Sequence, residues 1–497
     1  MKKEFFITLI IAFLVLLYRF NVSPPLLNQD ESSFANAAYN ISQNLHDKHD
    51  RFLPLYFETL GSPIIDWKNP FLVYWTAIFI KVLGFSVFST RLASIVLGLI
   101  SVVYVYKTVS LLFTSKYVPM LSTISLLLSP LFIIQSRINI DPIAMVAVTS
   151  IEIYFLLKYY FSQNKKDLIY AAITSGVNFY TYSPARLYSG LILILGIILL
   201  SKKLNIKELF IRLIIPLSIN FLFIIPAIYW QLLYPGLITS RYQSMFLPLN
   251  FKNLLSGYWT NYFRYFDFSF IFGHGDFDLL HSTGRSGVFL FVLIPVYLIG
   301  LLSLYLDKKM KGFRLFLLLM FILYPIGIFI TTETYRACRT IVMLNIFPLI
   351  LAYGWDKISK KSRVLFFCLV VGMIMQSSYV LHDLYYRYPI RTRLSWQYRY
   401  QLSVQVEDML NTSLQNPNKQ YYIDSNIYFG DDVLDYYQNI LGEKSTNIIF
   451  SDDLGVASKS GGVLLTNRIN GEAEVPAGNE IISGWEGYYL ITNKHEL

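Results

Sequence analysis

The chain has 497 residues, of which 54% are hydrophobic and 15% are charged, and its mean hydropathy is +0.46. This composition excludes a soluble globular protein, and the apolar residues fall in blocks of roughly 18–22, the length that crosses a bilayer. The net charge is +10, but most lysines flank the apolar blocks, so the charge reports membrane topology and we expect no nucleic acid partner. The sequence predicts a polytopic α-helical membrane protein.

The first predicted element is an apolar helix over residues 4–20. It begins like a signal peptide, but a small-residue cleavage site is missing and SPPLL follows, so we expect a retained membrane span. Further predicted spans cover residues 88–113, 117–135, 142–161, 168–183, 186–200, 209–231, 287–306, 313–331, 337–354 and 363–381. The sequence thus predicts about 11 membrane helices. A shorter apolar block, Pro70–Phe85, carries Lys81 and is ambiguous.

Lysine-rich connections indicate on which side of the membrane each loop lies. They are MKK, Lys107 with Lys116, QNKKD, SKKLNIK, DKKMKGFR and DKISKKSR. If all face the cytoplasm, the chain crosses the membrane an even number of times between MKK and Lys116. The block 70–85 should then lie on the outer surface as a juxtamembrane helix. We expect a cytoplasmic N-terminus, and we expect the loops 21–87 and 232–286 to lie outside the plasma (inner) membrane.

Two adjacent carboxylates, Asp30 and Glu31, follow the first span in the stretch NQDESSF. They open a segment with apolar residues at helical spacing, so a helix-capping role is one reading of the pair. The same outer loop carries Asp66 and Lys68 in IIDWKNP, and it is rich in aromatic side chains, among them Trp67 and Tyr74. Carboxylates and aromatic platforms at a membrane surface are typical of a site for a sugar–phosphate–lipid ligand.

Arginine, rather than lysine, marks the outer ends of the predicted helices. A guanidinium group holds phosphate through two parallel hydrogen bonds, whereas anchoring to lipid headgroups is the simpler reading of any single arginine. Because several arginines occur on the side that is usually depleted in positive charge, we predict an anion site there. The residues are Arg137, Arg186, Arg285, Arg336 and Arg339.

The composition changes after residue 382. Short strand-like runs (QYYIDS, TNIIFS, GGVLLTN and GYYLITN) alternate with helix-like segments (VEDMLNTSL and DDVLDYYQNIL). We therefore predict two domains, a transmembrane domain over residues 1–382 and a small α/β domain outside the membrane over residues 383–497. The second domain contains no nucleotide-binding pattern.

In this order, the motifs resemble those of the polyprenol-phosphate-sugar-dependent glycosyltransferases (family 39 type). These are membrane enzymes of the GT-C fold, and they include protein O-mannosyltransferases and lipid A aminoarabinose transferases. The resemblance covers roughly residues 1–380. It rests on the outer-loop Asp-Glu pair and on DWKNPFLVYW, GFSVFSTRLASIVLG, SRINIDPIA, YTYSPARLY, HSTGRSGV and TTETYRACRTIVMLNIFP.

The resemblance implies roles for individual residues. Asp30 falls on the catalytic aspartate, which would act as general base, and Glu31 falls on the acid beside it. Asp66 and Lys68 fall on the family's D-x-K/H-P-P element, although Asn69 replaces its first proline. We expect Glu31, Asp66, Trp67, Lys68 and Tyr74 to line the acceptor or substrate pocket. The five outer arginines would bind the donor phosphate, and Tyr182 and His281 would contact sugar or lipid.

The implied reaction moves a monosaccharide from a polyprenyl-phosphate donor to a lipid, glycan or protein acceptor by a single inverting displacement. It needs no cofactor. Three acids (Asp30, Glu31 and Asp66) could hold a divalent ion, but the resemblance argues against a metal. Two alternatives stay open, a transporter of an anionic or glycolipid substrate and a glycan polymer ligase. The sequence leaves the sugar and the acceptor undefined.

Overall fold

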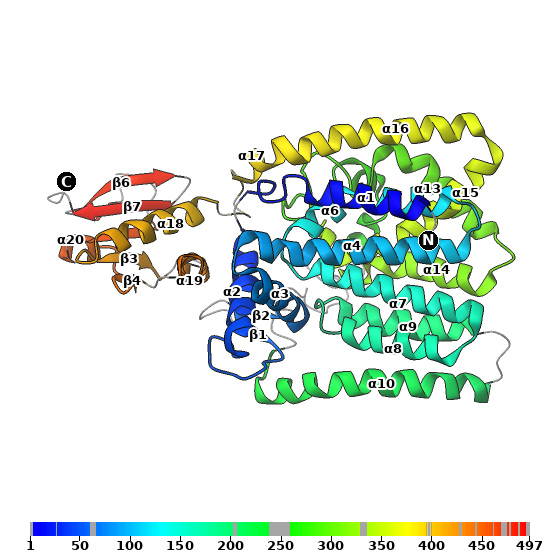
Figure 1. The fold of residues 1–497 in the computed structure, drawn as a ribbon, viewed down its shortest axis with the longest axis horizontal. Helices are drawn as coiled ribbons and strands as arrows, with labels where there is room; N and C mark the ends of the chain where they lie inside the picture. The colour runs from blue at the N-terminus through cyan, green and yellow to red at the C-terminus, as the bar shows by residue number, and fades with distance from the viewer. Residues whose placement is uncertain are drawn as a thin grey trace.

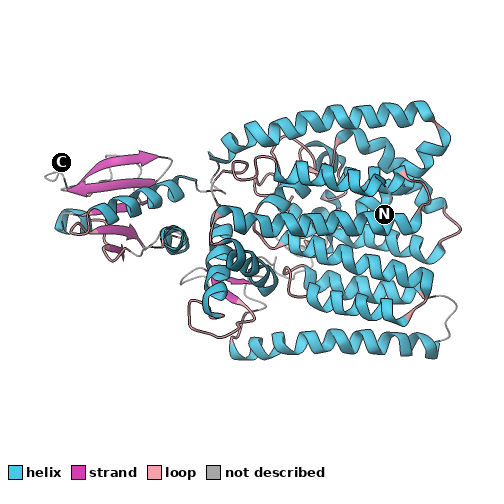
Figure 2. Cartoon of the chain, viewed as in Figure 1, coloured by secondary structure: helices cyan, strands magenta, loops and turns pink. Residues whose placement is uncertain are grey.

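The computed structural model describes residues 3–25, 27–59, 66–201, 206–237, 259–328, 335–393, 395, 398, 400–425, 427, 430–442, 445–460, 462–468, 475–476, 479–485 and 488–493. A large helical bundle is followed by a smaller unit that contains a β-sheet (Figures 1 and 2). Long helices in the bundle run side by side. Two shorter helices, α2 (Gln29–Asn44) and α3 (Pro70–Leu83), cross one end of it, which we call the α2 end.

The bundle is built from helices that coincide with the predicted spans, either alone or with a short 3-10 or second helical segment. They are α1 (Lys3–Leu17), α4 (Val87–Leu112), α5 (Tyr117–Leu127), α6 (Pro130–Arg137), α7 (Pro142–Ser162), α8 (Lys165–Asn178), α9 (Ala185–Leu200), α10 (Ile206–Leu233), α13 (Ile294–Leu306), α14 (Lys311–Leu323), α15 (Met343–Lys361) and α16 (Arg363–His382). Short helices α12 (Trp259–Arg264) and α17 (Tyr388–Arg393) lie between and after them.

Hydropathy and length together identify membrane-crossing candidates among the described helices. Four qualify, namely α4, α7, the segment Lys207–Leu233 and the segment Arg363–Arg393; the bent pair α5–α6 makes a fifth. Shorter apolar helices cover Pro70–Leu83, Ala185–Leu200 and Phe291–Leu306. The protein therefore has membrane-spanning helices, while the number of about 11 stays a prediction.

One predicted span, 117–135, is not a straight helix. It bends by 66° between α5 and α6. Pro130 lacks the N–H that would continue the hydrogen-bond ladder, and it occupies the first turn of α6 instead. Ser129 caps the new helix by accepting a hydrogen bond from the Phe132 N–H, and its own hydroxyl donates to the Val288 carbonyl at 2.6 Å. The bend thus has a local chemical cause.

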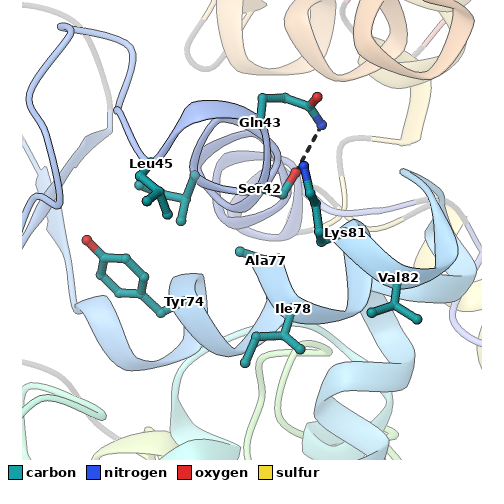
Figure 3. Close-up of a pocket in the computed structure, with 9 residues that line it drawn as sticks. Ser42, Gln43, Leu45, Tyr74, Ala77, Ile78, Lys81 and Val82 are labelled. Atoms are coloured by element: carbon teal, nitrogen blue, oxygen red, sulfur yellow. Dashed lines mark hydrogen bonds between the residues drawn. The ribbon is translucent and has the colours of Figure 1, made fainter.

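The surface between α2 and α3 contains a groove of about 520 Å³ (Figure 3). Its walls are mostly apolar, and Ile78 and Val82 of α3 are exposed there at 57% and 76%. Next to α3, a hairpin of β1 (Phe57–Thr59) and β2 (Asp66–Lys68) pairs Phe57 with Lys68. The hairpin and α3 together fix the segment that carries Lys68 at the α2 end.

A five-stranded sheet forms the core of the C-terminal unit. Its strands, in spatial order, are β4 (Ile448–Ser451), β3 (Tyr421–Asp424), β5 (Val463–Thr466), β7 (Tyr488–Asn493) and β6 (Asn479–Trp485). The β4–β3–β5 part is parallel, and β7 and β6 are antiparallel. Helices α18 (Tyr400–Gln415), α19 (Gly430–Leu441) and α20 (Val456–Ser460) accompany the sheet, and α19 packs against α2.

Candidate active site

Helix α2 begins with a capping box that places Asp30 in its first turn. The Asn28 side chain accepts a hydrogen bond from the Glu31 N–H, and the Glu31 carboxylate accepts one from the Asn28 N–H. Asp30 pairs with Lys68, whose Nζ lies 2.6 Å from Asp30 Oδ1. The Asp30 side chain is 36% exposed, whereas that of Lys68 is only 4% exposed. A buried ammonium group therefore holds a carboxylate that solvent can reach.

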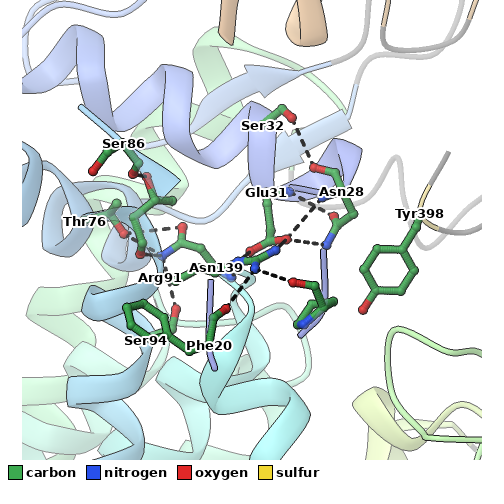
Figure 4. Close-up of polar contacts among 12 residues, drawn as sticks. Phe20, Asn28, Glu31, Ser32, Thr76, Ser86, Arg91, Ser94, Asn139 and Tyr398 are labelled. Carbon is green, nitrogen blue, oxygen red and sulfur yellow. Dashed lines mark hydrogen bonds and ion pairs between the residues drawn. The ribbon is translucent and has the colours of Figure 1, made fainter. Parts of the chain in front are cut away.

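Glu31, which follows Asp30 in the sequence, lies in a buried cluster of polar side chains that includes Arg91 and Asn139 (Figure 4). Its carboxylate is fully buried and accepts two hydrogen bonds of 3.0 Å from the Arg91 guanidinium. It also accepts the Asn139 N–H at 2.9 Å and the Asn28 side-chain amide at 3.0 Å. Both oxygens are engaged inside the protein, so Glu31 joins α2 to α4. Its role in lining a substrate pocket stays a prediction.

Asn69 connects the Lys68 segment with two charged residues from other helices. Its amide nitrogen lies 3.1 Å from Asp141 Oδ2, and its amide oxygen accepts a hydrogen bond of 2.8 Å from Arg186. Asp141 immediately precedes α7, and Arg186 lies in the first turn of α9. Arg186 is thus linked through Asn69 to the chain segment that carries Lys68.

Tyr56 covers the same arginine, and its ring centre lies 5.5 Å from the Arg186 guanidinium carbon. Burial raises the pKa of Tyr56, although the charge of Arg186 opposes this rise. Burial likewise raises the pKa of Tyr74, whose hydroxyl donates to the Pro54 carbonyl at 2.9 Å. Both phenols stay protonated at neutral pH, so Asp30 is better suited than either to accept a proton.

The other four outer arginines have separate surroundings. Arg137 is buried, donates to the Tyr18 carbonyl and lies over the Tyr385 ring at 5.0 Å. Arg336 forms an ion pair with Asp278, and Arg339 is buried with its Nη1 3.4 Å from the Tyr182 hydroxyl. Arg285 is exposed. Arg186, by contrast, binds Asn69, the residue that follows Lys68 in the chain.

The other predicted site residues lie in different parts of the bundle and the hairpin. His281 is buried, and its Nδ1 lies 2.9 Å from the Gln135 amide nitrogen. Trp67 packs on Tyr234 with ring centres 5.5 Å apart. The Asp66 backbone pairs with Thr59 in the hairpin, but its side chain lies outside the described part, so its pocket role stays a prediction. The described residues contain no group of three or more His, Cys, Asp or Glu that could hold a metal ion.

Sequence reasoning missed three residues that organise this region, Arg91, Asn69 and Asp141. Arg91 lies within the FSTRLAS motif, 60 positions after Glu31, and the sequence contains no signal that joins the two. Asn69 stands where the family's element has its first proline, and this departure gives no sign of its contacts with Asp141 and Arg186. Asp141 lies before Pro142 at the start of a span, and that position is the signal that could have identified it.

Comparisons with known proteins agree with this architecture. Residues 68–230 match the sequence model of the family described as dolichyl-phosphate-mannose-protein mannosyltransferase. The crystal structure of ArnT from Cupriavidus metallidurans bound to undecaprenyl phosphate superposes with a TM-score of 0.61 at 11% identity, over 98% of this chain and 97% of that chain. The chain therefore shares the GT-C fold of this glycosyltransferase structure. The resemblance inferred from the motifs is thereby confirmed.

Two structures from Archaeoglobus fulgidus share the GT-C fold over a smaller part of their own length. The oligosaccharyltransferase crystallised with Zn and sulfate has a TM-score of 0.56 at 12% identity, and it is matched over 90% of this chain and 62% of its own. The oligosaccharyltransferase AglB, in complex with an inhibitory peptide and a dolichol-phosphate, has a TM-score of 0.52 at 12% identity, with coverages of 88% and 63%. No curated protein sequence matches this GT-C chain.

Proposed function

We propose that this GT-C glycosyltransferase moves a monosaccharide from a polyprenyl-phosphate donor to an acceptor on the extracytoplasmic face of the plasma (inner) membrane. One observation carries the proposal, namely that the buried Lys68 ammonium holds the partly exposed Asp30 carboxylate. The next residue in the chain, Asn69, binds Arg186. The lipid phosphates named for the ArnT and AglB structures support a lipid-phosphate donor for this chain too.

The reaction is a single displacement at the anomeric carbon of the donor sugar. The acceptor hydroxyl oxygen forms the new bond to this carbon while the bond to the phosphate oxygen breaks and the lipid phosphate departs with the electron pair. Asp30 takes the proton of the hydroxyl as general base. Lys68 orients the carboxylate through the 2.6 Å contact. Attack on the face opposite the leaving group inverts the anomeric configuration.

The leaving phosphate carries negative charge that a fixed guanidinium can stabilise. Arg186 is the best candidate because Asn69 holds it next to the Lys68 segment. Arg339, together with Tyr182, is the next candidate. The other outer arginines, Arg137, Arg285 and Arg336, stay candidates from their predicted position at the outer helix ends. The reaction uses no cofactor or metal ion.

The test of this function uses purified full-length protein, a native membrane extract as acceptor and a panel of radiolabelled polyprenyl-phosphate monosaccharides. We expect label transfer from one member of the panel with stoichiometric release of the polyprenyl phosphate. Transfer from a lipid-linked oligosaccharide assayed in parallel, with no transfer from the monosaccharide donors, would favour a polymer ligase. Uptake of a labelled anion into proteoliposomes without any transfer would favour a transporter. Either of these results would refute the proposed function.

A further inference from the structure

Helix α2 contacts both the helical bundle and the C-terminal unit. Its contact with the bundle includes the Glu31–Arg91 pair. The Ser33 hydroxyl lies 2.5 Å from Asp432 Oδ2 of α19 and donates to it. The Asn36 side chain donates to the Asp432 carbonyl at 2.7 Å. All three residues are buried, each less than 8% exposed. These contacts join segments about 400 positions apart in the sequence.

Apolar packing reinforces the same junction. Ala35 of α2 and Leu27, which precedes the helix, belong to the hydrophobic core of the C-terminal unit, together with Val406 and Val433. The Phe85 ring contacts the Tyr436 ring edge-on, with centres 5.3 Å apart. The neighbouring residues Phe34, Ala38 and Ile41 belong instead to the core of the helical bundle. One short helix therefore contributes to two hydrophobic cores.

The position of Asp30 on α2 gives this junction a consequence for catalysis. Ser33 is three residues after Asp30, so both lie on neighbouring positions of the helix surface. Lys68, the partner of Asp30, is carried by the hairpin and not by α2. A rotation of α2 about its axis would therefore change the distance between the Asp30 carboxylate and the Lys68 ammonium. The Glu31–Arg91 pair fixes this rotation relative to the bundle. The Ser33–Asp432 hydrogen bond fixes it relative to the C-terminal unit.

We propose that Asp432 is a positioning residue, through which the C-terminal unit holds α2 in the rotation that aims Asp30 at the acceptor hydroxyl. The inference rests on the proposed role of Asp30 as base. It predicts that the C-terminal unit acts on the rate of the chemical step. A unit that served only to bind the acceptor would act on acceptor affinity.

The kinetic test compares Asp432→Ala, Asp432→Asn and Ser33→Ala in the full-length protein. We expect Asp432→Ala and Ser33→Ala to lower kcat about tenfold or more, because small displacements of a catalytic group are strongly penalised. The acceptor KM should stay within about twofold of wild type. Asp432→Asn should recover most of the rate, since its amide oxygen still accepts from Ser33. The matched control is Asp453→Ala, an exposed acid of the same unit.

A second readout needs no enzyme activity. Hydrogen–deuterium exchange of peptides covering α2 should be faster in Asp432→Ala than in wild type and unchanged in Asp453→Ala. A higher acceptor KM with unchanged kcat, or unchanged exchange in α2, would overturn the inference. If wild type transferred no sugar from any donor, the proposed function would fail, and the exchange data alone would decide whether Asp432 anchors α2.

Discussion

Replacing Arg91 by methionine removes one partner of the buried ion pair that joins α4 to α2. Both side chains of the pair are 0% exposed, and the guanidinium donates to both oxygens of Glu31. Arg91 also donates to the carbonyls of Phe20 and Pro24 at 3.2 and 2.8 Å. The substitution leaves the Glu31 carboxylate buried without its countercharge.

Breaking a buried pair in this way destabilises proteins by about 3–5 kcal/mol. Asn28 and Asn139 still donate to the Glu31 carboxylate in the variant, so we expect a value near the lower end, about 3 kcal/mol. The double variant Glu31→Gln/Arg91→Met carries no unpaired charge. Its loss should be smaller than the sum of the two single losses by about 1 kcal/mol or more.

The assay heats detergent-solubilised protein and measures the folded fraction by size-exclusion chromatography. We expect the melting temperature of Arg91→Met to fall by about 5 °C. The control is Lys360→Met, because Lys360 pairs with Asp356 in solvent with its side chain 67% exposed. Its loss should stay below about 1 kcal/mol. If Arg91→Met melted together with wild type while losing activity, Glu31 would be a pocket residue and the structural reasoning would be wrong.

Three further predictions test the site and the bundle. Lys68→Met should lower kcat about tenfold or more because Asp30 loses the ammonium that orients it. Initial rates at saturating acceptor measure kcat, and an unchanged kcat would contradict the orienting role of Lys68. Dialysis against EDTA should leave the transfer rate within about twofold of the untreated enzyme, since the proposed step uses no metal; loss restored by a divalent ion would contradict it. Gly354→Ala should lower the melting temperature because a Cβ there would collide with the Val296 carbonyl of α13. Gly190→Ala is the control and should leave the melting temperature unchanged, since its Cβ would meet nothing within 4 Å. Equal melting temperatures of the two variants would contradict the close helix packing.

The sequence predicts the positions of the bundle helices well because most of them are apolar blocks, a property of local composition. The α2 helix is predicted because apolar residues recur at helical spacing after Asp30 and Glu31. The capping residue in the structure is Asn28. The 66° bend at Pro130 is missed because a proline in a span is compatible with either a kink or a straight start. Strand β6 is missed because Ser483 and Gly484 interrupt its apolar pattern.

The contacts within the candidate site join distant segments of the chain and are not predictable from local sequence patterns. The sequence identifies Asp30 and Lys68 separately, but their 2.6 Å contact depends on the hairpin that brings β2 to α2. The same motif places Asp30, as general base, and Glu31, as a pocket residue, in one predicted site. The structure separates them because residues adjacent on a helix point about 100° apart, so Glu31 faces Arg91 in the core while the partly exposed Asp30 faces Lys68. Such partner choices depend on tertiary packing, which a single sequence does not encode locally.

The proposed chemistry is tested most directly by measuring sugar transfer in wild type, Asp30→Asn and Asp50→Asn under identical conditions. Asp50 is an exposed acid of the same outer loop with φ of 60°, a conformation that asparagine tolerates. We expect Asp30→Asn to lower the transfer rate by about 100-fold or more, because the general base is lost. Asp50→Asn should transfer sugar at the wild-type rate. Near-normal transfer by Asp30→Asn would contradict the assignment of Asp30 as the base.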